Sequence, residues 1–148
     1  MPRIERGGVK IESVHDLKDI AHHHEREFGR YLGTQNVKAD YETVEFQVSG
    51  INPRTGEYGL MSHRPDFPVI DLESGKECFI EITTSPYDPE SFDPKARQKK
   101  IMELYMEEIG ENIVYLVLYQ QNLMEIQNSY PELRLNFFQR ADGLYSPK

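Results

Sequence analysis

The sequence predicts an α/β fold in which a mixed central β-sheet is flanked by helices. Three patterns indicate it: a long amphipathic helix near the N-terminus, a β-hairpin in the middle of the chain, and a continuous apolar run near residue 115. The chain has 148 residues, of which 38% are hydrophobic and 28% charged. This length suffices for one compact domain, and we expect residues 1–148 to form it.

The first helix is predicted to begin after Ser13 and to end near Leu32, just before Gly33. Its apolar residues recur at steps of three and four, which marks one buried face: Val14, Leu17, Ile20, Ala21, Phe28, Tyr31 and Leu32. Alternation over residues 41–48 predicts a strand, and the composition of residues 52–57 is typical of a turn.

The β-hairpin is the clearest local pattern. Residues 66–72 have the composition of one strand, residues 73–76 of a turn, and residues 77–84 of the returning strand. Pairing across this hairpin brings Asp66 and Glu81 together at one end of the sheet.

Helices and strands alternate in the last third of the chain. Asp93 can cap a helix over residues 94–109, because proline is tolerated at its first position. The apolar run at residues 113–119 predicts a strand that is buried on both faces. A short helix at residues 122–129 and a late strand at residues 133–138 are expected to follow.

The predicted pair of carboxylates indicates a metal site. Two adjacent carboxylates repel one another, so Asp66 and Glu81 need a compensating cation or a function. Mg²⁺ and Mn²⁺ take oxygen ligands, and the end of a hairpin holds such ligands on a rigid base. A bound divalent ion can activate water and stabilise charge on a phosphate, so the pair predicts hydrolysis of phosphodiester bonds.

These residues also resemble a known family. Arg64-Pro65-Asp66, the hairpin and Glu81-Ile82-Thr83 look like the motif of the PD-(D/E)XK nuclease superfamily, and the resemblance covers roughly residues 13–119. It implies a restriction-endonuclease-like fold and a metal-dependent endonuclease. By the same resemblance, Asp66 and Glu81 would be catalytic metal ligands, and the carbonyl of Ile82 would be a further ligand.

One departure from the superfamily pattern is Thr83, which stands where its lysine is expected. The cap-snatching endonucleases of segmented negative-strand RNA viruses have a similar pattern, with the lysine on the following helix and a histidine on the first helix. That resemblance implies His24 as a metal ligand and Lys99 as the catalytic lysine. Spacing alone leaves Lys95 and Lys100 open, with Lys100 the second choice.

The first helix offers further ligands. Helical spacing puts His24 on the inward face with Phe28, and puts Glu25 on a face with Leu32. Nucleases that the sequence resembles often carry a glutamate on this helix. We therefore predict Glu25 as a third acidic metal ligand, with Glu27 as the alternative.

The net charge of −8 counts against a nucleic acid partner. Nucleic-acid-binding proteins are usually basic on at least one face, although residues 95–100 form a local basic cluster. We expect a nucleic acid substrate, with DNA slightly favoured over RNA, and leave a homodimer open. The acidity and Thr83 also favour an alternative, a nuclease fold that no longer cleaves and serves as a binding or interaction module.

The remaining features of the sequence indicate the cellular compartment of the protein. No apolar stretch approaches the roughly 20 residues needed to span a bilayer, and the N-terminus lacks the apolar run of a signal peptide. The single cysteine, Cys78, cannot form an internal disulfide, and we expect it to be a small core residue. These features predict a cytoplasmic protein without a membrane partner.

Overall fold

The computed structural model describes residues 3–6, 9–10, 22–35, 37–71, 77–88, 90, 93–109, 114–130 and 132. Helices and strands alternate along the chain. In order they are β1 (Arg3–Arg6), β2 (Val9–Lys10), α1 (His23–Thr34), β3 (Val37–Tyr41), β4 (Val44–Ile51), β5 (Tyr58–His63), β6 (Phe67–Asp71), β7 (Glu77–Ile82), α2 (Ala96–Ile109), β8 (Val114–Leu118) and α3 (Gln120–Ser129).

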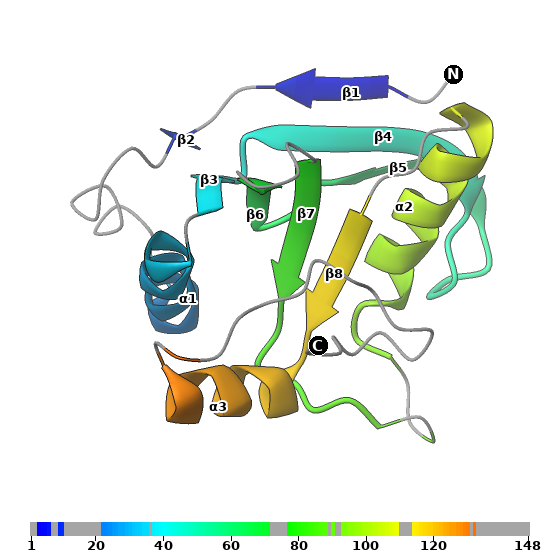
Figure 1. Ribbon diagram of the computed structural model, residues 1–148. Helices are drawn as coiled ribbons and strands as arrows, with labels where there is room; N and C mark the ends of the chain where they lie inside the picture. Colours follow the sequence, from blue (N-terminus) through cyan, green and yellow to red (C-terminus); the bar gives the residue numbers. More distant parts are fainter. Residues whose placement is uncertain are drawn as a thin grey trace.

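The described strands form two sheets (Figure 1). A three-stranded antiparallel sheet has the order β1-β4-β5, and a five-stranded sheet has the order β2-β3-β6-β7-β8. Within the second sheet β7 and β8 run parallel and the other pairs run antiparallel, so the sheet is mixed. The α2 helix lies between β7 and β8 in the sequence, as a parallel crossover requires. The predicted α/β class with a mixed sheet is therefore confirmed.

Helices α1 and α3 cover one face of the five-stranded sheet (Figure 1). Alternate residues of β7 point to this face, where they pack with Phe28 of α1 and Ile126 of α3: Cys78, Ile80 and Ile82. Cys78 is 1% exposed, which confirms its predicted place in the core.

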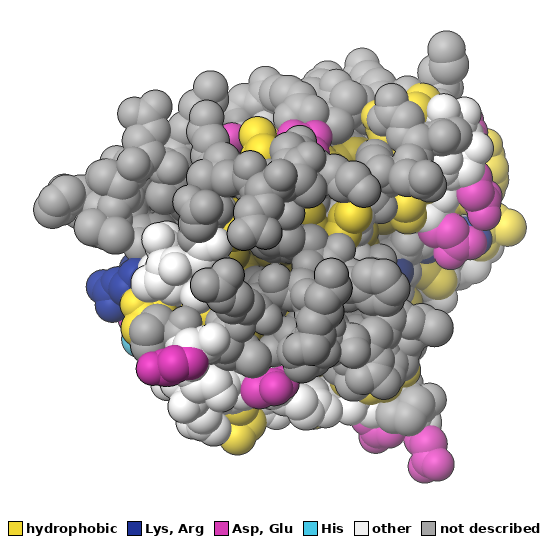
Figure 2. All heavy atoms as spheres, in the orientation of Figure 1, with side chains coloured by type: hydrophobic (Ala, Val, Ile, Leu, Met, Phe, Trp, Pro, Cys, Tyr) yellow, Lys and Arg dark blue, Asp and Glu magenta, His cyan; other side chains and the backbone are white. Residues whose placement is uncertain are grey.

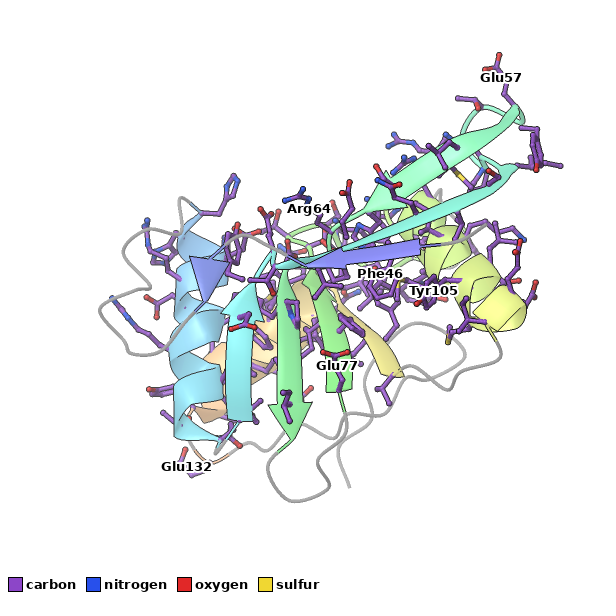
Figure 3. The ribbon with its side chains drawn as sticks, turned by 90° about the horizontal axis from the view of Figure 1, so that it is seen from above. Phe46, Glu57, Arg64, Glu77, Tyr105 and Glu132 are labelled. Carbon is purple, nitrogen blue, oxygen red and sulfur yellow. The ribbon has the colours of Figure 1, made fainter. Side chains whose placement is uncertain are left out.

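Helix α2 and the β4–β5 hairpin cover the opposite face of β7 and β8. Phe46 of β4 packs edge-on against Phe79 of β7 and Tyr105 of α2, with ring centroids 4.8 and 4.9 Å apart. Figure 3 shows Phe46 and Tyr105 facing one another between the strand and the helix. Because both faces of β7 are covered, the side chain of Glu81 is only 5% exposed even though it is ionisable.

The hairpin at residues 66–82, the helix beginning after Asp93 and the doubly buried strand near residue 115 are confirmed. The predicted strand at residues 41–48 was wrong in its start, because Glu42 adopts φ 52° and separates β3 from β4. Strand β5 was not predicted at all, since Gly59 weakens its alternating pattern. The predicted helical residues 14–21, the turn at 73–76 and the strand at 133–138 lie outside the described residues.

None of the helices that the structure describes combines the length and the apolar character needed to cross a bilayer. Figure 2 shows one face of the molecule, on which the coloured acidic side chains are more widespread than the basic ones. This agrees with the net charge of −8.

Candidate metal centre

Asp66 and Glu81 lie side by side at one end of the five-stranded sheet. The hairpin register pairs Phe67 with Ile80, so the next pair outward is Asp66 with Glu81. The backbone N–H of Ile82 donates a 2.9 Å hydrogen bond to Asp66 Oδ2, which fixes this carboxylate against β7. In Figure 3, Glu77 marks the opposite end of β7. The juxtaposition predicted from the hairpin pattern is thus present in the structure.

Two further carboxylates approach Asp66. Carboxylate oxygens of Glu25, Glu42 and Asp66 all lie within 4.8 Å of one another. Glu25 comes from the first turn of α1, and its Oε2 accepts a 2.7 Å hydrogen bond from the hydroxyl of Tyr41. Together with Glu81 these groups form an acidic cluster, by which we mean Glu25, Glu42, Asp66 and Glu81.

Glu42 was missed by the sequence analysis. It lies between β3 and β4 in the left-handed region, and its N–H donates a 2.9 Å hydrogen bond to the carbonyl of Asp66. A left-handed conformation is unusual for a residue with a side chain. The turn holds Glu42 beside Asp66 in this conformation, although the two residues are far apart in the sequence. Its place in the middle of an apparent strand gave no signal for this contact.

Lys95 supplies the positive charge nearest to Glu81. Its Nζ donates a 3.1 Å hydrogen bond to Glu81 Oε1, and the two side chains are 17% and 5% exposed. The second oxygen, Glu81 Oε2, is buried and accepts no hydrogen bond from the described N–H and O–H donors. A carboxylate oxygen in this position requires either a proton or a cation.

His63, the last residue of β5, approaches the same oxygen from the other sheet. Its Nε2 lies 3.0 Å from Glu81 Oε2 without forming a hydrogen bond to it. The same Nε2 is 3.0 Å from the hydroxyl of Tyr115, with which it makes its hydrogen bond. The sequence analysis also missed His63; its position three residues before Asp66 was the available signal.

Burial raises the pKa of three carboxyl groups of the cluster and lowers the pKa of the neighbouring His63. Burial and the neighbouring Glu81 carboxylate raise the pKa of Asp66 to about 8. Burial also raises the pKa of Glu81 and of Glu25, despite the opposing effect of Lys95 on Glu81 and of Tyr41 on Glu25. Burial lowers the pKa of His63 to about 4, so its imidazole is neutral at physiological pH. Clusters of perturbed groups are typical of functional sites.

Lys99, which the sequence analysis predicted to be catalytic, binds other residues and not Glu81. Lys99 Nζ donates a 2.9 Å hydrogen bond to Asp93 Oδ2 and lies 5.0 Å from the ring centre of Tyr119. Lys100 is near the surface, 3.7 Å from Glu103. The structure therefore brings Lys95, and neither of the two lysines that the sequence analysis preferred, against Glu81.

The histidine predicted on α1 is also outside the cluster. His24 is exposed, and the expectation that it points inward was wrong. It lines a cavity of about 320 Å³ between α1 and α3, together with His23 and Leu123. Because it lies in the first turn of α1, one residue before Glu25, it is rotated by about 100° away from the carboxylates.

The two glutamates considered on α1 lie in different places. Glu25 reaches the cluster, whereas Glu27 is exposed and forms a 2.8 Å ion pair with Arg30 on the surface. Ile82 is next to Asp66 through its backbone N–H, and a ligand role for its carbonyl stays a prediction. The hydroxyl of Thr83 accepts a hydrogen bond from the N–H of Ser85, a turn-type contact after β7.

The acidic cluster combines oxygen donors from α1, the β3–β4 turn and the β6–β7 hairpin in a partly water-excluded site. Such a set suits a hard divalent cation. No protein-family model, curated protein or solved structure matches this chain.

Proposed function

We propose that this chain is a divalent-metal-dependent nuclease that hydrolyses phosphodiester bonds in nucleic acid, with a restriction-endonuclease-like arrangement of the site. The observation that carries the proposal is the convergence of the acidic cluster, in which Glu81 Oε2 is buried without a hydrogen-bond donor among the described groups. Lys95 pairs with the other oxygen, Glu81 Oε1, so the charge of this buried carboxylate is only partly compensated, and a buried polar atom without a partner costs roughly 1 to 3 kcal/mol. The raised pKa values mean that these carboxyl groups hold protons. A cation that replaces these protons removes the cost and leaves the carboxylates ionised.

The donor set fits Mg²⁺ or Mn²⁺. Asp66 is close to Glu25 and Glu42 and also interacts with Glu81, so its carboxylate can share a bound ion with either set of oxygens. Carboxylate oxygens are the preferred ligands of both ions. When bound, such an ion supplies Lewis acidity toward a phosphate and lowers the pKa of water.

Lys95 is the residue that we assign to charge stabilisation. Its ammonium is held at the cluster by Glu81, and the Lys95 side chain is 17% exposed, so a substrate phosphate can approach it. A lysine in this position offers the developing negative charge a hydrogen-bond donor close to the metal ligands. It would fill the place that Thr83 leaves open in the superfamily pattern.

His63 and Tyr115 have a supporting role in this proposal. The pair is buried on the inner side of Glu81, and the neutral imidazole keeps water from reaching the carboxylate from that side. Tyr41 in turn holds Glu25 through its hydroxyl, so that the carboxylate stays directed toward Asp66. Such supporting contacts orient ligands and tune their basicity.

The function is tested with single- and double-stranded DNA and RNA in Mn²⁺, in Mg²⁺ and in a chelator. Cleavage is expected from the wild type and from Glu27→Ala, which changes a surface glutamate of the same helix. Asp66→Asn should abolish cleavage, and thermal melting would show that this isosteric variant is folded. DNA is the expected substrate by a small margin. The proposal fails if no substrate is cut, or if Asp66→Asn cuts as well as the wild type.

A second candidate, a binding module with a nuclease-like fold, is favoured by the net charge of −8 and by Thr83 at the lysine position. Calorimetry with Mn²⁺ separates the two. Metal uptake that depends on Asp66, with no cleavage of any substrate, would favour the binding module. Uptake together with cleavage would exclude it.

A further inference from the structure

A second group of polar contacts lies at the start of α2, outside the acidic cluster. The carboxylate of Asp93 accepts hydrogen bonds there with both of its oxygens. Oδ1 accepts one of 2.9 Å from the N–H of Lys95 and one of 3.0 Å from the hydroxyl of Tyr119. Oδ2 accepts one of 2.9 Å from Lys99 Nζ. Asp93 therefore joins the segment that enters α2 to the end of β8 and to α2 itself.

The carboxyl group of Asp93 is well suited to hold these donors. Burial alone would raise its pKa, but hydrogen bonds from Lys99, from the N–H of Lys95 and from Tyr119 outweigh burial and lower the pKa. The group is thus ionised at neutral pH. Hydrogen bonds to a charged acceptor are stronger than those to a neutral one. The contacts of Asp93 are therefore expected to persist in solution.

Tyr119 anchors Asp93 to the core. The side chain of Tyr119 is fully buried and packs in the core cluster between α2 and the sheet, with its ring 5.1 Å from that of Tyr87. Side chains packed in a core keep a fixed position. The hydroxyl of Tyr119 therefore holds Asp93 Oδ1 in place, and Oδ1 in turn holds the backbone of Lys95.

This anchor explains how Lys95 reaches the acidic cluster. Lys95 and Glu81 are 14 residues apart in the sequence, at the two ends of the segment that joins β7 to α2, yet Lys95 Nζ lies 3.1 Å from Glu81 Oε1. Closing such a loop and ordering a long lysine side chain both cost conformational entropy. Fixing the backbone of Lys95 at Asp93 removes part of this cost, because the side chain then starts from a defined point.

We propose that Asp93 is a positioning residue, which holds Lys95 against Glu81 by binding the N–H of Lys95 with Oδ1. Its effect on cleavage rests on the proposed nuclease function. The contact of Asp93 Oδ2 with Lys99 is separate from this role. Lys99→Ala leaves the partners of Oδ1 in place, and it therefore serves as the matched control.

Kinetics of cleavage in Mn²⁺ test the effect on the reaction. Asp93→Ala should lower kcat at least about fivefold and leave KM within about twofold, because Lys95 acts on charge that develops in the reaction. Asp93→Asn keeps an oxygen that can accept the N–H of Lys95, and it should cleave within about twofold of the wild type. Thermal melts show whether both variants are folded. Cleavage by Asp93→Ala at the wild-type rate would overturn the proposal.

A double variant separates positioning from a general loss of structure. If Asp93 acts through Lys95, a protein that lacks the lysine has nothing left to position. Asp93→Ala combined with Lys95→Ala should then cleave within about twofold of Lys95→Ala alone. Losses that multiply in the double variant would mean that Asp93 does not act through Lys95, and they would contradict the proposal.

NMR signals of the lysine ammonium groups test the same contact without substrate. The signal of Lys95 is the one that Lys95→Arg removes, and Glu81→Gln shows how it changes when the ion pair is lost. Asp93→Ala should change it in the same way, whereas Lys99→Ala should leave it unchanged. An unchanged Lys95 signal in folded Asp93→Ala would overturn the proposal. If the signal changes as expected but the wild type cuts no nucleic acid, the positioning of Lys95 stands and the proposed nuclease function fails.

Discussion

Lys95 Nζ and Glu81 Oε1 form an ion pair of 3.1 Å at the edge of a cluster of buried carboxylates. The pair joins the segment before α2 to the end of β7, two elements that meet only in the folded chain. Removing one partner of a buried pair leaves the other charge uncompensated. Lys95 therefore affects both the ionisation of Glu81 and the charge that a bound phosphate would meet.

The two lysines near the start of α2 should respond differently to substitution. Lys95→Ala is expected to lower the cleavage rate at least about tenfold, because it removes the donor next to Glu81. Lys99→Ala should retain activity and lose about 1 kcal/mol of stability, since Lys99 pairs with Asp93 and stacks on Tyr119. Cleavage assays and thermal melts on both variants show which lysine acts in catalysis and which one acts in stability. Loss of cleavage in a folded Lys99→Ala protein would mean that Lys99 is the catalytic lysine, as the sequence analysis predicted.

The metal-free protein should lose stability as the pH rises toward 8. The pKa of Asp66 is raised to about 8 from its ordinary value near 4, so the folded state binds this proton more tightly than the unfolded state. The stability that Asp66 contributes is fully present at low pH. It is lost as the pH rises through the pKa that Asp66 has in the folded state. A single group changes stability by at most about 1.4 kcal/mol per pH unit.

Denaturant titrations in a chelator between about pH 6.5 and pH 8 measure this loss, and the comparison with Asp66→Asn cancels the contribution of the histidines. The free energy of unfolding of Asp66→Asn should change less over this pH range than that of the wild type. At pH 8 the variant should be the more stable of the two proteins. Mn²⁺ should raise the stability of the wild type at pH 8 and leave the variant unchanged. Equal slopes for the two proteins would show that Asp66 does not carry the proton.

His63 should make the opposite contribution at lower pH. Its pKa is lowered to about 4, so the folded state resists protonation and stability is lost as the pH falls from about 6.5 through 4. His63→Gln keeps a polar side chain without this titration. The difference between the stability curves of the two proteins should shrink by up to about 3 kcal/mol over that interval. A constant difference would mean that His63 binds its proton as readily in the folded state as in the unfolded state.

The paired glycines of the β4–β5 hairpin provide a test of packing. Gly50 and Gly59 are direct cross-strand partners, but a Cβ added at Gly50 would collide with the side chain of Leu104 on α2. Gly59 faces open space. Gly50→Ala should cost about 1 to 3 kcal/mol, whereas Gly59→Ala should be neutral or slightly stabilising. Comparable losses at both positions would argue against the packing of α2 under β4.

The sequence by itself determined the pairing of Asp66 with Glu81. The two residues belong to one hairpin with a short connection, so local strand composition and a turn pattern suffice to fix their register. It also determined the helix after Asp93, because the aspartate and proline begin a helix through local contacts. Elements of this kind depend on neighbours within about twenty residues, which a single sequence displays.

Only the tertiary structure decided the rest of the site. His63 and Glu42 enter it through contacts between the two sheets and through a left-handed turn, neither of which leaves a periodic pattern. Lys95 precedes the first residue of α2, Ala96, and lies about one helical turn from Lys99, so the two lysines share nearly the same side of the axis but differ in their position along it. Which side chain reaches a distant carboxylate depends on how the helix docks on the sheet. That docking is fixed by the whole core, and the spacing of residues along one segment does not contain it.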